Sequence, residues 1–231
     1  MIMKFTSTLI KGKLIKRYKR FFTDIKVNNQ IITAHCPNTG SMMGLLNDGN
    51  EVWVSKNDDP KRKLKYTLEI IKTNKSLIGV NTHRANRIVE DALKKKLIND
   101  FEKSKLIKPE FKFSKDTRFD FLCDKKIIEV KNVTLTRENK IAEFPDAVTS
   151  RGTKHLKNLV YSIKKNYEPY VLFLTQIQGI EYFKIAKDID SEYYNNYILA
   201  KKSGVKFIAY RCFISSKEIK IEKKIKILDE K

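Results

Sequence analysis

The sequence of 231 residues contains no apolar run close to the roughly 20 residues that span a bilayer. Its first residues, MIMKFTSTLIKGK, lack the long apolar segment and the small-residue cleavage site of a signal peptide. Cysteine is scarce: Cys36, Cys123 and Cys212 are widely spaced and form no CxxC pair. These absences argue against a membrane partner, a disulfide framework and a structural zinc site, and they predict a cytoplasmic protein.

Acidic residues are few compared with basic ones. The sequence has 27 Asp and Glu and 48 Lys and Arg, which gives a formal net charge of +21. Such an excess attracts polyanions and favours nucleic acid as the partner. Most of the excess is lysine, alongside much Ile and Asn, which is also how AT-rich genomes encode ordinary surfaces. Charge alone therefore favours a nucleic-acid partner without locating its binding site.

The first 81 residues are predicted to be all-β. Short alternating or apolar runs are separated by turn signals such as PNTG at 37–40 and NDGN at 47–50. Short strands at such spacing within about 80 residues indicate a small barrel, of which the oligonucleotide-binding OB-fold is one solution. We therefore expect an N-terminal OB-like β-barrel over residues 1–81.

Two stretches of the predicted barrel interleave cations with aromatic rings, KRYKRFF at 16–22 and KRKLKY at 61–66. This mixture is typical of surfaces that grip phosphates and stack bases. A strand with a solvated basic face and one core aromatic explains either stretch when it is taken singly, so both interpretations stay open. The candidate nucleic-acid-binding residues here are Arg17, Tyr18, Lys19, Arg20 and Arg62.

The segment HCPNTGSM at 35–42 is dense in special residues. Its Pro-Asn-Thr-Gly turn has backbone amides that could hold an anion. His35 and Cys36 could act as ligands or as a nucleophile pair, but adjacent residues of a strand point to opposite faces. We interpret the segment as a structural turn with a buried cysteine.

Residues 82–231 are predicted to form an α/β sheet domain, because helical patterns alternate with strand patterns. The expected helices are 82–98, with Thr82 as its N-cap, 153–165 and 191–202. The last stretch, EIKIEKKIKIL, alternates and predicts a strand at the sheet edge whose lysines protect it from further pairing. The domain boundary is placed near residues 80–82.

Candidate chemistry is concentrated in residues 118–132, RFDFLCDKKIIEVKN, which predict two short strands and a tight turn. Because side chains alternate along a strand, an even-numbered loop places Asp120, Glu129 and Lys131 on one side. A turn at 125–126 puts Asp120 across from Lys131, whereas a turn at 124–125 puts it across from Glu129. The opposite side is then an apolar underside made of Phe121, Cys123, Ile128 and Val130.

Two carboxylates and a lysine above a buried face suit a Mg²⁺ or Mn²⁺ ion beside a phosphate, since hard cations prefer oxygen ligands. The lysine can orient an attacking water or offset charge that develops on phosphorus. An exposed cross-strand pair between Lys131 and a carboxylate is the alternative interpretation. Glu90 lies at the margin of the apolar face of helix 82–98, from which it could reach a site between helix and sheet.

Taken in order, the segments resemble the sugar fermentation stimulation protein family of bacteria and archaea. The resemblance rests on RYKRF, HCPNTGSM, VNTHRANRIVEDAL, RFDFL with EVKNVTL, FPDAVTSRGTKHL and the stretch 204–210, which span nearly the whole chain. It implies an OB-like barrel followed by an α/β domain of the PD-(D/E)xK nuclease type. Members of the family are described as sequence-nonspecific DNA-binding proteins.

The resemblance also implies roles for individual residues. Asp120 and Glu129 become metal carboxylates, the carbonyl of Val130 becomes a further ligand, and Lys131 becomes the catalytic lysine. Additional residues implied are Glu90 as an extra carboxylate and Arg151, Lys154 and His155 as phosphate contacts. Phe119 stands where the motif has its proline, and Asp146 of the literal Pro-Asp pair follows Glu129 and Lys131, so it is interpreted as a loop residue.

Two functions follow from these observations. The first is sequence-nonspecific binding of DNA, with RNA as an alternative polyanion, and the second is Mg²⁺-dependent hydrolysis of phosphodiesters. A direct transcriptional regulator of sugar metabolism has the least support, because no helix-turn-helix signature is evident. A homodimer is left open by the sequence.

Overall fold

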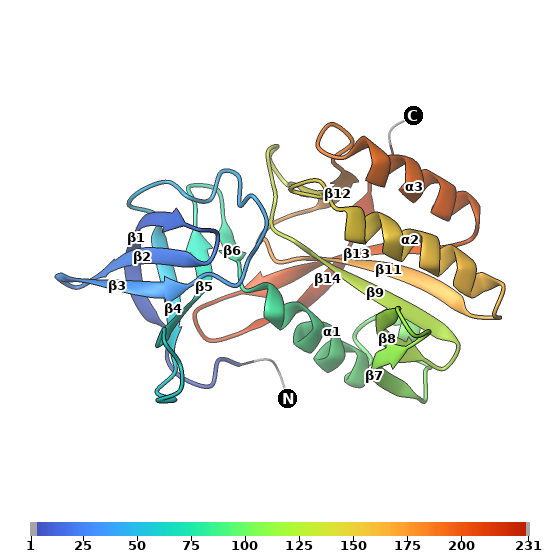
Figure 1. Cartoon of the computed structure of the whole chain (residues 1–231), viewed down its shortest axis with the longest axis horizontal. Coiled ribbons are helices and arrows are strands. Elements are labelled where there is room, and N and C mark those ends of the chain that lie inside the picture. The colour runs from blue at the N-terminus through green and yellow to red at the C-terminus, as the bar shows by residue number, and fades with distance from the viewer. Residues whose placement is uncertain (1–3, 230–231) are drawn as a thin grey trace.

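The computed structural model describes residues 4–229 and shows a β-barrel beside a larger α/β sheet (Figure 1). The barrel strands are β1 (Ile10–Tyr18), β2 (Phe22–Val27), β3 (Gln30–His35), β4 (Glu51–Lys56) and β5 (Tyr66–Lys72), followed by the short β6 (Leu77–Gly79). Their order is β3-β2-β1-β4-β5-β6, and a parallel pairing of β3 with β5 closes the first five strands. The predicted OB-like barrel is confirmed.

Alternating apolar side chains fill the barrel. Leu14, Ile25, Val52, Val54 and Leu68 are fully buried, and they come from four of the five strands. Cys36 is also fully buried, and Cys36, Cys123 and Cys212 are free thiols. No helix within residues 4–229 is long and apolar enough to cross a membrane.

The first helical segment begins with the short 3₁₀ helix η1 (Thr82–Arg84) and continues as α1 (Ala85–Lys94). The sequence predicted one helix over 82–98 capped by Thr82. The helical segment does begin at Thr82, but the cap is the preceding residue and α1 ends at Lys94. Asn81 is the cap, because its side-chain oxygen accepts from the backbone N–H of His83 at 3.1 Å. Thr82 Oγ1 instead donates to the carbonyl of Pro37 at 2.6 Å, which ties the helix start to the barrel.

The second sheet contains eight strands in the order β10-β12-β14-β13-β11-β9-β8-β7. After the 3₁₀ helix η2 (Asn99–Phe101), the elements are β7 (Ile107–Lys112), β8 (Arg118–Cys123), β9 (Lys126–Val133), β10 (Ile141–Phe144), α2 (Ser150–Ile163), β11 (Glu168–Thr175), β12 (Tyr182–Ile185), α3 (Ser191–Lys202), β13 (Lys206–Ile214) and β14 (Ile219–Ile227). Helices α2 and α3 cover one face and α1 the other (Figure 1). Alternate residues of β11 accordingly join different cores, Val171 with the first and Leu172 with the second.

The C-terminal strand β14 does not lie at the sheet edge as the sequence predicted. It pairs antiparallel with β13 and parallel with β12, and the edges are β10 and β7. The alternation of apolar and charged residues in β14 has a different cause. Ile219 and Ile221 are buried in the second core, and Ile225 is buried in the first. Strand β10, which has only four residues, was not predicted from the sequence.

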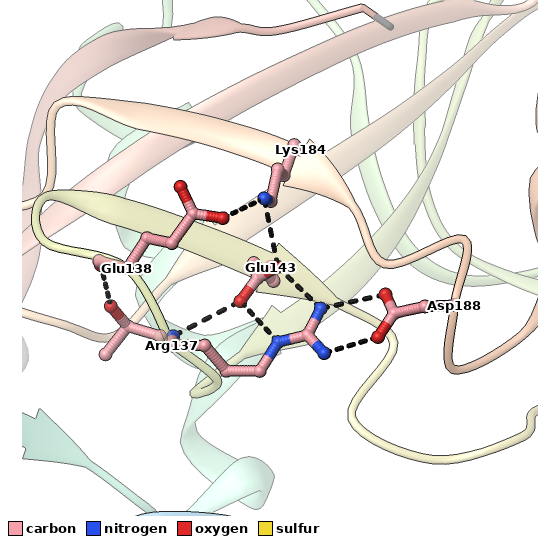
Figure 2. Close-up of polar contacts among 6 residues, drawn as sticks. Arg137, Glu138, Glu143, Lys184 and Asp188 are labelled. Carbon is pink, nitrogen blue, oxygen red and sulfur yellow. Dashed lines mark hydrogen bonds and ion pairs between the residues drawn. The ribbon is translucent and has the colours of Figure 1, made fainter.

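A polar network fastens β10 and β12 at one edge of the sheet (Figure 2). Arg137 donates to both carboxylate oxygens of the buried Glu143, at 2.9 and 2.8 Å, and Lys184 adds an ion pair at 3.6 Å. The same guanidinium binds Asp188 and lowers the pKa of that carboxyl to about 2. Two residues later Asp190 caps α3 and accepts from Thr149 N–H at 2.8 Å, so this edge helps to place the start of α2.

Candidate nuclease-like site

The hairpin of β8 and β9 has the second of the two registers that the sequence left open. Its turn is Asp124-Lys125, with Cys123 paired to Lys126 and Phe121 paired to Ile128. Asp124 adopts a left-handed φ of 53°, a conformation that aspartate tolerates better than most residues. Continued by one step, this register puts Asp120 across from Glu129.

The backbone pairing of β8 with β9 ends at Phe121 and Ile128. Beyond this point the side chain of Asp120 takes the place of a backbone acceptor. Asp120 Oδ2 accepts from the backbone N–H of Val130 at 2.7 Å, and Oδ1 accepts from Asn86 Nδ2 of α1 at 2.7 Å. The predicted apolar underside is buried in the second core. Asp120 is therefore held between two strands and a helix.

Glu129 is the more deeply buried of the two carboxylates, with 4 % of the residue exposed. Its Oε1 accepts from Lys131 Nζ at 2.7 Å and is in direct contact with His155 Nδ1 of α2. Its Oε2 is buried and has no hydrogen-bond partner within residues 4–229. A buried charged oxygen without a partner is costly, so this atom faces a place where a ligand would stabilise it.

The two carboxylates differ in their pKa shifts. Burial, followed by the nearby charge of Glu129, raises the pKa of Asp120 to about 6, against the hydrogen bonds from Val130 and Asn86. Burial also acts on Glu129, but Lys131 and His155 together hold its pKa below the usual range. Glu129 is thus the permanent anion, while Asp120 is poised to exchange a proton near neutrality.

A second unpartnered polar atom lies in the same region. The hydroxyl of Tyr193 on α3 is buried without a hydrogen-bond partner in the described part of the chain. Burial, and then the charge of Glu129, raise the pKa of Tyr193 well above its ordinary value. The sequence pattern offered no signal for Tyr193, because only the packing of α3 on α2 brings it into this region.

The donor set suits Mg²⁺ better than a cation that needs a complete protein cage. Mg²⁺ is usually held by one or two carboxylates, with substrate oxygens and water filling the other positions. Asp120 and the free Glu129 Oε2 meet that requirement. Within residues 4–229 no three His, Cys, Asp or Glu side chains form a metal-binding group, and the carboxylate of Glu90 pairs with Lys94. Asn86, one turn before Glu90, is the helix residue that reaches the site.

A cavity of about 460 Å³ adjoins the site through His155, which lines it and contacts Glu129. We call it the cationic cavity; its basic residues are Lys112, Lys115, Arg118, Arg151 and Lys154. Asp116 is the single acid among the lining residues, and Arg118 also contacts Glu110 at 3.5 Å. Arg151 and Lys154 of α2 were predicted as phosphate contacts, whereas Lys112, Lys115 and Arg118 of the β7–β8 hairpin were not, although the stretch FKFSK at 111–115 also interleaves lysines with aromatic rings.

The candidate residues of the barrel have several placements. Arg17 donates to the carbonyls of Asn38 at 2.7 Å and Gly40 at 3.1 Å, so its guanidinium braces the turn at 37–41. Tyr18 is 36 % exposed and stacks on Phe22 with ring centroids 5.5 Å apart. Lys19 and Arg20 form the exposed β1–β2 turn, and Arg62 lines a separate pocket beside the helix start.

The turn at 37–42 also contacts the α/β domain. The backbone N–H of Met42 donates to Asp146 Oδ2 at 3.4 Å. A Cβ added to Gly40 would overlap the carboxylate of Asp146, so only glycine permits this approach. Asp146 therefore joins the barrel to the loop before α2, in agreement with its interpretation as a loop residue.

Family models match both parts of the chain. Residues 15–80 match the model described as the SfsA N-terminal OB domain, and residues 83–218 match the sugar fermentation stimulation protein RE domain. The chain is 64 % identical over 231 residues to a sugar fermentation stimulation protein homolog of Pelagibacter ubique, covering 98 % of this chain and 100 % of that one. A homolog from Pseudoalteromonas atlantica is 41 % identical over 234 residues, with 98 % and 100 % covered.

A solved structure has the same fold. It is that of Pyrococcus furiosus SfsA in complex with Ca²⁺, which is 22 % identical and has a TM-score of 0.88 over 99 % of this chain and 100 % of that chain. Its likeness confirms the succession of an OB barrel and a curled α/β sheet. With both family models matched and close relatives covered end to end, this chain belongs to the sugar fermentation stimulation protein family.

Proposed function

We propose that this protein binds DNA without sequence preference, and that the cationic cavity holds the phosphate backbone. The observation that carries the proposal is the position of the cavity. Five basic side chains, from the β7–β8 hairpin and from α2, surround one acid, and His155 connects the cavity to the carboxylate of Glu129. Phosphate contacts of this kind supply affinity that does not depend on sequence. The OB barrel, a fold that often binds oligonucleotides, supports the same conclusion.

The first test is the salt dependence of binding. We expect the affinity for a labelled oligonucleotide to fall steeply with salt and to vary little between unrelated sequences. Lys154→Ala should weaken binding and reduce the salt slope by about 0.9, the change that one lost phosphate contact produces. Lys202→Ala, an exposed lysine at the end of α3, is the control for net charge. Salt-independent binding, or equal effects of the two variants, would contradict the proposal.

A second function, Mg²⁺-dependent hydrolysis of phosphodiesters, is favoured by the unpartnered Glu129 Oε2. Asp120 and Glu129 would hold the ion, and the ion would supply Lewis-acid activation of the phosphate. Lys131, close to Glu129, would offset charge on the reacting phosphate, and His155 would keep Glu129 oriented. The fold relative from Pyrococcus furiosus was solved with Ca²⁺, another hard divalent ion, which supports a divalent ion in this fold.

The test of hydrolysis uses purified protein with labelled single-stranded and double-stranded DNA and RNA. Mg²⁺ or Mn²⁺ is added, and Asp120→Asn and Lys131→Ala are assayed in parallel. Product that requires the metal and is lost in both variants is the expected result. If no substrate is cut above the level of the variants, hydrolysis is rejected, and the site is left with a binding role.

A further inference from the structure

A separate pocket of about 360 Å³ lies where the barrel meets the start of α1. We call it the junction pocket. It is bounded by β3, β5 and the β4–β5 loop on the barrel side and by η1 on the other; the residues that carry the argument are His35, Arg62, Thr67, Glu69, His83 and Arg84. In Figure 1 the chain passes from β5 and β6 directly into α1 at this point.

The acid of the junction pocket is neutralised by its neighbours. Glu69 is 1 % exposed, and it accepts from Ser55 Oγ at 2.7 Å and Asn81 Nδ2 at 2.9 Å. Arg84 binds both of its carboxylate oxygens. Among the lining residues that the structure describes, Glu69 is the single acid, so no free carboxylate faces the pocket. The exposed Lys56 pairs with Asp58 at 2.8 Å.

The remaining basic groups face one another without a counter-ion. Arg62 donates to the neutral hydroxyl of Thr67 at 3.3 Å and forms no ion pair within residues 4–229. The rings of His35 and His83 lie 6.4 Å apart. Burial, then the charges of His83 and Arg62, lower the pKa of His35. Two imidazoles and a guanidinium that repel one another would all be stabilised by one bound anion.

A row of aromatic side chains leads across the barrel to this pocket. Tyr18 is the cross-strand partner of Phe22, and Phe22 is the partner of His35. His35 in turn is the partner of Thr67 on β5, where Arg62 donates its hydrogen bond. Partly exposed rings in a row are a platform on which successive bases can stack.

The junction pocket is also close to the carboxylate site. His83 of η1 lines the pocket, and Asn86 of α1 holds Asp120. His83 and Asn86 are three positions apart along the helix, which corresponds to a rise of about 5 Å along the axis. A strand that leaves a phosphate in the pocket therefore has a short path to Asp120.

We propose that the junction pocket binds a phosphate group of a nucleic-acid strand, on Arg62, His35 and His83, while neighbouring bases stack on Tyr18 and Phe22. The inference rests on the proposed nucleic-acid binding and adds to it a defined subsite. The phosphate is either the terminal monoester of a strand or an internal diester. Either kind of phosphate offers anionic oxygens to the same three side chains, and the experiment below distinguishes the two.

The experiment measures anisotropy of oligothymidine labelled at its 3′ end, with a 5′-phosphate or a 5′-hydroxyl, in EDTA. Arg62→Gln is compared with Lys61→Gln, the adjacent residue with the same change of charge. We expect Arg62→Gln to weaken binding about tenfold, the loss of one charge-assisted hydrogen bond, and Lys61→Gln to have a much smaller effect. Loss confined to the 5′-phosphate strand assigns the terminal monoester, and equal loss on both strands assigns the diester. Equal effects of the two variants overturn the proposal.

A second measurement separates this proposal from general nucleic-acid binding. Inorganic phosphate is titrated into the intact protein, and the imidazole signals of His35 and His83 are followed by NMR, with His35→Gln and His83→Gln for assignment. Saturable shifts of both signals support the pocket even if oligonucleotides do not bind, because inorganic phosphate presents the same anion to both rings. Signals that do not move overturn the proposal, whereas loss of oligonucleotide binding alone rejects only the proposed function.

Discussion

Two buried glutamates of the same sheet are partnered in opposite ways. Glu143 on β10 has both oxygens bound by Arg137, with Lys184 nearby (Figure 2). Glu129 on β9 has one oxygen bound by Lys131 and His155, and the other has no partner within residues 4–229. Each is almost fully buried, so burial alone does not explain the difference.

The difference separates a structural carboxylate from a ligand-ready one. A buried ion pair whose hydrogen bonds are complete holds its elements in place and leaves no position for a ligand. An incomplete one is retained at a free-energy cost that a substrate or metal can offset. The surroundings agree, because the cationic cavity adjoins Glu129, while Arg137 is balanced by Asp188.

The largest expected effect comes from breaking the complete network. Arg137→Met leaves the buried Glu143 with the backbone N–H of residue 137 at 3.2 Å and Lys184 at 3.6 Å, and we expect the free energy of unfolding to fall by about 3 kcal/mol or more. Urea denaturation at neutral pH measures it. The double variant Arg137→Met with Glu143→Leu should recover much of the loss, because both charges are then removed. A loss below about 1 kcal/mol for the single variant would contradict the structural role of the Arg137–Glu143 ion pair.

The incomplete site should respond in the opposite way. Asp120→Asn removes a charge whose burial is unfavourable but also removes one acceptor, so we expect the unfolding free energy to change by less than about 1 kcal/mol. Mg²⁺ or Mn²⁺ affinity, measured by calorimetry, should fall at least about tenfold, because even the loss of a residue that only hydrogen-bonds to a metal ligand lowers affinity by that factor. Glu90→Gln is the matched control, since Glu90 pairs with Lys94. An equal loss in Glu90→Gln would instead bring a third carboxylate into the site.

The raised pKa of Asp120, about 6, gives the site a pH dependence. Between its ordinary value and about 6, the folded protein holds a proton that the unfolded chain has released. Ionisation of Asp120 therefore lowers stability as pH rises through this window. Metal binding at the proposed site should have the reverse trend, because the ion must displace the proton. We expect affinity about tenfold weaker near about pH 5 than near about pH 7; pH-independent affinity over this range would contradict the shift.

Much of the fold follows from local patterns, and the exceptions have physical reasons. The period of two along each strand and the apolar face of α1 depend on near neighbours, so the barrel and the hairpin faces could be predicted. The position of β14 inside the sheet could not, because alternation indicates a covered strand without saying which strands flank it. The hairpin register depends on the left-handed conformation of Asp124. The sequence allowed a turn at either 124–125 or 125–126 and could not decide between them.

The site was predictable to the extent that it lies on one hairpin. Asp120, Glu129 and Lys131 share a short segment whose geometry is set by the pleat of two strands. Contacts from distant segments were not predictable, such as His155 on Glu129 and the carbonyls of the 37–41 turn on Arg17. The latter contacts give Arg17 a structural role, because its guanidinium already donates to carbonyls of the barrel turn.

The smallest expected effect tests whether the hydrogen bonds around Asp120 set its proton affinity. Asn86 Nδ2 donates to Oδ1 and favours the ionised form, against burial and Glu129. Asn86→Ala removes that donor, so the pKa of Asp120 should rise further, and divalent-ion affinity near about pH 6 should fall by a few-fold, as the loss of one hydrogen bond predicts. Because the effect acts through the proton, it should shrink near about pH 8, where Asp120 is ionised in both proteins. A loss of the same size at both pH values would mean that Asn86 acts on the position of Asp120 and not on its charge.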